Sequence, residues 1–134
     1  MNTAEIKVSD LEGAALDLAV AWADGDKVSV EDGYVVVAEF SEQHGDFFNV
    51  CYSPSTNWSQ GGPLIEANKI ELLFFGSLGE CGCPWEAQLA YDIHYIVQRP
   101  GEAVGGATPL IAAMRAIVAS KLGEVVNVPV ELLP

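Results

Sequence analysis

The sequence predicts an α+β fold, in which a mostly antiparallel sheet of four or five strands carries two main helices on one face. Three observations indicate this fold. Segments with helical character lie near the two ends of the chain, at residues 10–24 and 109–122. Short runs of β-branched and aromatic residues lie between them. One of these runs contains Asp32-Gly33, a pair typical of a tight antiparallel hairpin.

The first helix is predicted to begin near Asp10 and to end at Gly25. Ser9 and Glu12 have the spacing of a capping box, and Gly25 can adopt the left-handed conformation that ends a helix. Its core face is expected to consist of apolar residues at helical spacing, Leu11, Ala15, Leu18 and Trp22. Its solvent side is expected to be marked by three acids, Glu12, Asp17 and Asp24.

Strands are predicted on both sides of the Asp32-Gly33 turn, at residues 47–52 and at residues 69–75. The segment from Glu86 to Gln98 fits either a short helix or a strand. A strand or an extended tail is predicted for residues 125–134, where Pro129 cannot donate to a sheet ladder.

The last helix is predicted from Pro109 to Leu122, with Thr108 as its N-cap and Gly123 as its end. It contains no acid and is apolar almost all round, so other elements or a second subunit must cover more than one side. Arg115 is the one cation in its body and needs an acid, a ligand or solvent. A structural pair with an acid is the simplest expectation.

Length and charge restrict the function. The 134 residues are expected to form a single domain, residues 1–134, with one core. Half of the residues are apolar, and the mean hydropathy is +0.24, so a homodimer interface is a further expectation. Six basic and 19 acidic residues give a formal net charge of -13, which repels phosphate backbones and anionic lipids. We expect no direct binding to nucleic acid or membranes, although an acidic surface that mimics DNA stays open.

Cysteine content and hydropathy indicate a cytoplasmic protein. The chain has no signal-peptide pattern and no apolar run of about 18 residues. Cys51, Cys81 and Cys83 lack the spacing of a disulfide framework. With His44 or His94 they could surround zinc, but a CxC pair without a second nearby pair is a weak zinc signature. We therefore expect ordinary thiols, no metal and no cofactor.

The segment PSTNWSQGGPLIE, residues 54–66, is the candidate recognition loop. Its two glycines can take positive backbone angles and present consecutive amides to an anion, while Trp58 could stack on a base or a sugar. Alternatively, Trp58 fills the edge of the core and the glycines only turn the chain. The candidate ligand site joins this loop to two residues of the last helix and comprises Asn57, Trp58, Gln60, Gly61, Gly62, Thr108 and Arg115.

Three stretches also suggest a family. GAALDLAVA at residues 13–21, PSTNWSQGGPLIE at residues 54–66 and TPLIAAMRAIVASKLGEVVNVP at residues 108–129 together resemble the NinX-like proteins of tailed phages and prophages. The resemblance implies a phage or prophage origin in a bacterial host, with no assigned activity and no catalytic residues to transfer.

These observations predict a non-enzymatic phage accessory protein that binds a host or phage protein. No nucleophile and base have a catalytic pattern. The first alternative is a small-ligand-binding protein or an enzyme, with a site formed by residues 58–62 and Arg115. The second alternative is an acidic DNA mimic.

Overall fold

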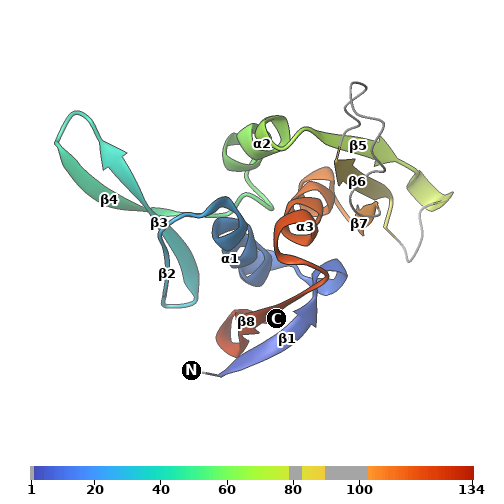
Figure 1. Cartoon of the computed structure of the whole chain (residues 1–134), viewed down its shortest axis with the longest axis horizontal. Coiled ribbons are helices and arrows are strands. Elements are labelled where there is room, and N and C mark those ends of the chain that lie inside the picture. The colour runs from blue at the N-terminus through green and yellow to red at the C-terminus, as the bar shows by residue number, and fades with distance from the viewer. Residues whose placement is uncertain (1, 79–82, 90–102) are drawn as a thin grey trace.

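The computed structural model describes residues 2–78, 83–89 and 103–134, and these form three α-helices and three small antiparallel sheets. The helices are α1 Gly13–Asp24, α2 Trp58–Ala67 and α3 Pro109–Leu122. In Figure 1, α1 and α3 lie side by side at the centre, and the sheets surround them. The α+β class is therefore confirmed, whereas a single sheet with both helices on one face is wrong.

The first sheet joins the two ends of the chain. Strand β1, Thr3–Lys7, pairs antiparallel with β8, Val125–Pro129, in a register that runs from Thr3 opposite Pro129 to Lys7 opposite Val125. The predicted terminal strand is thus confirmed, but its partner β1 has no clear signal in the sequence. Val126 and Val128 of β8 are buried against α1 and α3, which explains why this end of the chain is extended.

The second sheet contains the predicted hairpin and has the order β2-β3-β4. Its strands are β2 Val28–Glu31, β3 Tyr34–Ser41 and β4 Asp46–Cys51. Asp32 and Gly33 both have positive φ angles, 51° and 79°, so the predicted tight turn is confirmed. Strand β2 pairs with residues 34–37 alone, and the rest of β3 continues as a two-stranded ribbon with β4.

The third sheet packs against α3 and has the order β5-β6-β7. Its strands are β5 Ile70–Phe74, β6 Trp85–Leu89 and β7 Val104–Gly106. Residues 86–89 of the ambiguous segment therefore belong to a strand, and residues 90–98 lie outside the described residues. A side chain at Gly106 would meet the backbone nitrogen of Ala112 at 2.5 Å, so glycine permits the close contact between this sheet and α3.

The beginning of α1 differs from the prediction. The helix begins at Gly13, its N-cap Glu12 makes no side-chain capping bond, and residues Val8–Asp10 form a 3-10 turn. The predicted capping box is therefore wrong. Leu11 is extended and 1% exposed, so the chain buries this side chain where a continuous helix would begin. The end is confirmed, since Gly25 has a φ of 77° and donates to the carbonyls of Ala21 and Trp22.

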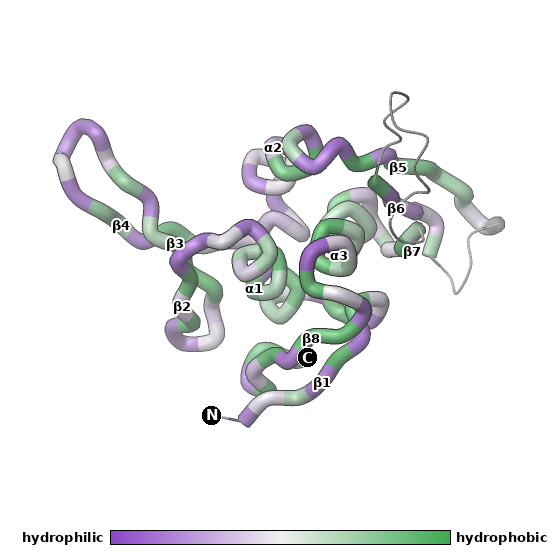
Figure 2. Tube along the Cα trace, viewed as in Figure 1, coloured by the Kyte–Doolittle hydropathy of each residue, from purple (hydrophilic) through white to green (hydrophobic). Residues whose placement is uncertain are grey.

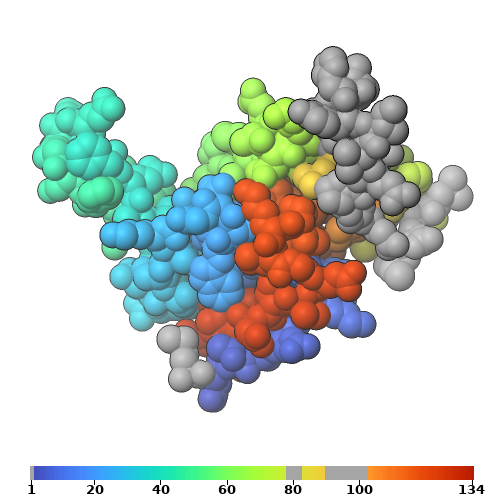
Figure 3. Space-filling model, in the orientation of Figure 1, coloured from blue at the N-terminus to red at the C-terminus, as the bar shows by residue number. Residues whose placement is uncertain are grey.

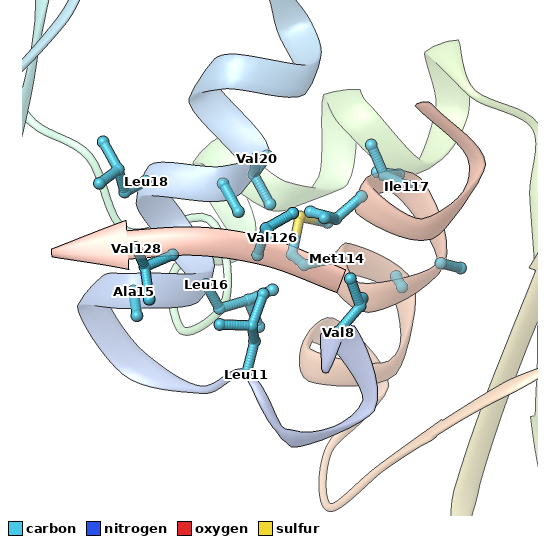
Figure 4. Packing of buried hydrophobic residues seen from close by; sticks show 14 of the residues in the cluster. Val8, Leu11, Ala15, Leu16, Leu18, Val20, Met114, Ile117, Val126 and Val128 are labelled. Atoms are coloured by element: carbon cyan, nitrogen blue, oxygen red, sulfur yellow. The ribbon is translucent and has the colours of Figure 1, made fainter. Parts of the chain in front are cut away.

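The core lies between α1, α3 and β8, as Figure 4 shows. Leu16 of α1 and Met114 and Ile117 of α3 are at most 1% exposed. Fully buried alanines of both helices, among them Ala15 of α1 and Ala112 of α3, permit neighbouring elements to pack closely. Because α3 is apolar almost all round, α1 and two separate sheets cover different sides of it, which a single sheet could not do.

Hydropathy along the trace agrees with this arrangement. The apolar stretches of α1 and α3 lie at the centre, while the projecting β3–β4 ribbon contains both hydrophilic and hydrophobic stretches (Figure 2). Trp22 was expected on the core face of α1 but is 40% exposed, because it lies in the last turn of that helix. Among the helices in the described part of the chain, none combines the length and hydropathy that a membrane crossing requires.

Candidate functional site

The predicted recognition loop is largely a helix. Trp58 is the first residue of α2, and Asn57 caps this helix by accepting a hydrogen bond from the Ser59 amide at 2.9 Å. The Trp58 side chain is 55% exposed, so the alternative that it fills the edge of the core is wrong. The glycines and Pro63 suggested an irregular loop, but the Asn57 cap and the packing of α2 outweigh their low helix propensity.

The Gln60 side chain connects α2 to the end of β4 by two hydrogen bonds. Its Oε1 accepts from the Ser53 amide at 2.7 Å, and its Nε2 donates to the Cys51 carbonyl at 2.9 Å. Both polar ends of the side chain are therefore engaged within the protein. These two bonds give Gln60 a structural role, because they hold its side chain in place.

The two glycines of α2 do not form an anion-binding concavity. Neither has a positive φ angle, so the predicted backbone geometry is wrong. Gly61 is buried, and a Cβ at this position would lie 2.5 Å from the Pro54 carbonyl oxygen and 2.6 Å from Leu110 Cδ2. Gly62 has open space where its side chain would be. Gly61 thus permits close packing of α2 against α3, and this packing explains its presence.

Thr108 and Arg115 also make internal bonds. Thr108 Oγ1 accepts from the Ile111 amide at 3.1 Å, which confirms the predicted N-cap of α3. Arg115 is 8% exposed and donates from Nε to the Leu11 carbonyl and from Nη1 to the Gly105 carbonyl, each at 2.8 Å. Among the residues that the structure describes, backbone carbonyls are its partners in place of the expected carboxylate. Arg115 therefore connects α3 to the segment before α1 and to β7.

The seven predicted site residues line neither of the two cavities described below. A cavity of about 690 Å³ lies between β1, β6, β7 and α3, and its lining includes Lys7, Gln88, Ser120 and Glu124 but none of the seven. Thr108 and Gly61 belong to the region where α2 meets α3. Binding of a small ligand by these residues stays a prediction.

Asp17 is a buried acid that the sequence placed on the solvent side of α1. It is 5% exposed, and its Oδ1 accepts from the Ser55 amide at 2.9 Å. Burial raises the pKa of Asp17 to about 6, and the Ser55 amide offsets part of the rise. The Ser55 hydroxyl also lowers this pKa, although it has no partner at hydrogen-bonding geometry and is buried. The bond connects α1 to the segment before α2.

Tyr52 lies near this acid and near the end of α1. Burial raises the pKa of the Tyr52 phenol, and the charges of Asp26, Asp24 and Asp17 raise it further. The pKa of Asp26 is also raised, first by partial burial and then by the charge of Asp24 and a hydrogen bond with it. Negative charge is thus concentrated between α1 and β4, and no group of three or more metal-ligating side chains lies together within residues 2–78, 83–89 and 103–134.

Of the cysteines and histidines that could surround zinc, the structure describes Cys51, Cys83 and His44. Cys51 is exposed at the end of β4, and Cys83 is half-buried before β6. Cys81 and His94 lie outside the described residues. His44 lies in the turn between β3 and β4, where its backbone amide donates to Ser41 Oγ at 3.3 Å.

The clearest surface feature is the end of the β3–β4 hairpin. We call residues 38–49, which extend beyond β2, the arm. Figures 1 and 3 show that the arm projects away from the helices. Three aromatic side chains of the arm are largely exposed: Phe40 at 54%, Phe47 at 69% and Phe48 at 47%. Apolar side chains of this size are usually covered in a folded protein, so their exposure needs a reason.

The register of the ladder assigns these rings to two faces. Directly opposed residues point to the same face of an antiparallel ladder, and successive residues alternate. Phe40 is opposite Phe47, and their rings meet edge to face with centroids 5.2 Å apart. Phe48 is opposite Glu39 and therefore points to the other face, which it shares with Asp46 of the same strand. One face of the arm is aromatic and uncharged, and the other is aromatic and acidic.

The uncharged face continues towards the body of the protein. Ala38 and Asn49 are the next opposed pair on this face, and both are exposed. They border a shallow hollow of about 300 Å³ that Lys27, Val28 and Val36 also line, so a basic residue lies where this face meets the body. The Phe40–Phe47 pair and this hollow thus form one continuous surface.

Sequence reasoning identified the strands of the arm but not this surface. A signal was nevertheless present in the residues of this ribbon. Three phenylalanines among acids in residues 38–49 could have drawn attention to that ribbon. Whether these phenylalanines are exposed depends on which other segments pack against them, and the local sequence does not show this.

Comparison with known protein families identifies a match over most of the chain. A family model described as Bacteriophage P22, NinX matches residues 7–121. The matched range includes α1, α2, the β2–β3–β4 sheet with its arm and nearly all of α3. Among curated proteins, none matches the chain significantly.

Proposed function

Because the chain belongs to the NinX family of bacteriophage P22, we propose that it is a non-enzymatic phage accessory protein that acts by binding a protein of the host or the phage. The family match confirms the resemblance seen in the sequence. The proposed binding surface is the arm, and we place the protein in the cytoplasm of the bacterial host. The exposure of Phe40, Phe47 and Phe48 is the observation that supports this proposal most directly.

The arm has no evident role in holding the fold together. The core residues come from α1, α3, β8 and neighbouring elements, and none of residues 38–49 belongs to the core. A two-stranded ribbon without further cover is only marginally stable in water. Covering one phenylalanine would contribute about 1.5–3 kcal/mol, and aromatic side chains are enriched where proteins bind one another. A partner that covers the three rings would account for both the projection and the exposure.

The small-ligand alternative has weaker support. Gln60 and Arg115 each make two hydrogen bonds within the protein, which give both side chains a structural role. Gly61 is covered by Pro54 and Leu110. Trp58 remains accessible at the beginning of α2, so its participation in binding can be tested separately from that of the arm.

The test is an affinity pull-down from infected host cells with matched variants. The double variant Phe40→Ser/Phe47→Ser removes the aromatic pair of the arm. Tyr34→Ser is the control, because Tyr34 is 66% exposed in the same strand but lies at its other end. Trp58→Ala tests the original candidate residue.

We expect the double variant to lose partners that the wild type and Tyr34→Ser both recover, with an unchanged melting temperature. If only the Trp58→Ala variant fails to recover a partner, the binding surface lies at the start of α2 instead. Equal recovery of every protein by all four forms would rule out the arm as the binding surface.

A further inference from the structure

We infer that the partner of the arm presents arginine or lysine side chains to the acidic face, where Phe48, Glu39 and Asp46 lie together. This inference rests on the proposed function, since it specifies the partner of the same arm. A second copy of the chain is thereby excluded as the principal partner.

These three side chains lie on one face of the arm. Glu39 of β3 is directly opposite Phe48 of β4, and such cross-strand neighbours have Cβ atoms about 4.5–5.5 Å apart. Asp46 precedes Phe48 by two residues in β4 and therefore points to the same face. A ring that is 47% exposed thus has an exposed carboxylate on two sides. Within the described residues, neither carboxylate has a hydrogen bond or an ion pair.

The chemistry of this cluster fits a cation on a long side chain. A guanidinium group can stack on an aromatic face while its N–H groups donate to a carboxylate, and an ammonium group can make the same contacts with less directional constraint. An apolar partner surface would instead leave Glu39 and Asp46 desolvated without compensation. The acidic face therefore selects for a cation, whereas the Phe40–Phe47 face selects for an apolar surface.

The charge of the arm and of the chain points to the same partner. Residues 38–49 contain Glu39, Glu42 and Asp46 but no lysine or arginine. The whole chain has a formal net charge of -13, so two copies would repel each other, and a basic protein would be attracted from a distance. Charge complementarity therefore favours a basic partner over self-association.

The first experiment maps the partner at single residues. Phe47→p-benzoylphenylalanine and Phe48→p-benzoylphenylalanine variants are produced in infected cells and irradiated, and the cross-linked peptides are sequenced by mass spectrometry. We expect position 48 to cross-link to a segment that contains arginine or lysine, and position 47 to an apolar segment of the same protein. Both positions are exposed, so the photoreactive group is tolerated on either face.

The second experiment measures the affinity of the purified partner identified in this way. Glu39→Gln/Asp46→Asn should weaken binding on the order of tenfold or more at low salt and should flatten its salt dependence. Glu31→Gln is the control, because Glu31 is an exposed acid at the far end of the same sheet. The Glu31→Gln variant should bind the partner with the affinity of the wild type.

The two experiments distinguish failure of the proposed function from failure of this inference alone. No specific cross-link at either position would overturn the proposed function of the arm together with this inference. A partner that cross-links at both positions but lacks cations near position 48, or whose affinity is the same for Glu39→Gln/Asp46→Asn, would overturn the inference alone. Cross-links mainly between two copies of the chain would also overturn it.

Discussion

At the scale of single residues, the most unusual group is the Asp17 carboxyl. It is buried in the middle of α1, and the one hydrogen bond that it accepts comes from the Ser55 amide. Neither the carboxylate nor the neighbouring Ser55 hydroxyl has a cation beside it among the described residues. A buried carboxylate without a cation favours its protonated form, because desolvation disfavours the charge.

This carboxyl predicts a pH dependence of stability. Its folded-state pKa of about 6 lies above the ordinary value of 3.8, so the native state binds the proton more tightly than the unfolded chain. The stabilisation is therefore fully present below about pH 4 and is lost as the pH rises through 6, at most about 3 kcal/mol. We expect Asp17→Asn, which keeps the acceptor oxygen without the charge, to be more stable than the wild type at pH 8.

Urea unfolding of both forms between pH 4 and 8 measures this effect. Taking the difference between the two forms removes the contribution of the other acids. The advantage of Asp17→Asn should grow from pH 4 to pH 7 and then level off. A difference in the free energy of unfolding that stays constant over this range would contradict the assignment.

At the scale of elements, the position of α2 depends on one close contact. Gly61 faces the Pro54 carbonyl and Leu110 at distances that leave no room for a Cβ, whereas the neighbouring Gly62 faces open space. Gln60 and Asn57 fix the same helix by hydrogen bonds. The segment that suggested a ligand site is thus a packing element between β4 and α3.

The two glycines form a matched pair for a stability prediction. Gly61→Ala should destabilise the protein by about 1–3 kcal/mol, because the added methyl group forces α2 away from Pro54 and Leu110. Gly62→Ala should be neutral or stabilising by up to about 1 kcal/mol, because alanine has the higher helix propensity. Chemical denaturation compares them, and equal effects of the two substitutions would show that α2 does not pack as described.

At the scale of the whole molecule, the chain consists of a packed body and a projecting arm (Figure 3). The body holds the two ends of the chain together through β1 and β8, and β8 contributes Val126 and Val128 to the core. The arm contributes no core residue. We therefore expect the terminal strand β8 to contribute much more to stability than the arm, although the two segments are of similar length.

Two deletions test this division. Replacing residues 40–47 with an Asn-Gly turn should leave the melting temperature within a few degrees of the wild type and should abolish partner binding. Removing residues 125–134 should abolish cooperative unfolding, because it exposes the core side of α1 and α3. Thermal unfolding followed by circular dichroism measures both. A large loss of stability on removal of the arm would mean that the arm belongs to the body.

Local signals in the sequence determined the C-terminal end of α1, both ends of α3, the Asp32-Gly33 hairpin, the terminal strand and the α+β class. They did so because glycine, proline and capping residues act through their own backbone geometry. Long-range packing decided the rest: the burial of Asp17, the helix at residues 58–67, the carbonyl partners of Arg115 and the division into three sheets. Long-range packing also decided that the phenylalanines of the arm are exposed. Whether a phenylalanine is buried depends on which segments, distant in the sequence, pack against it.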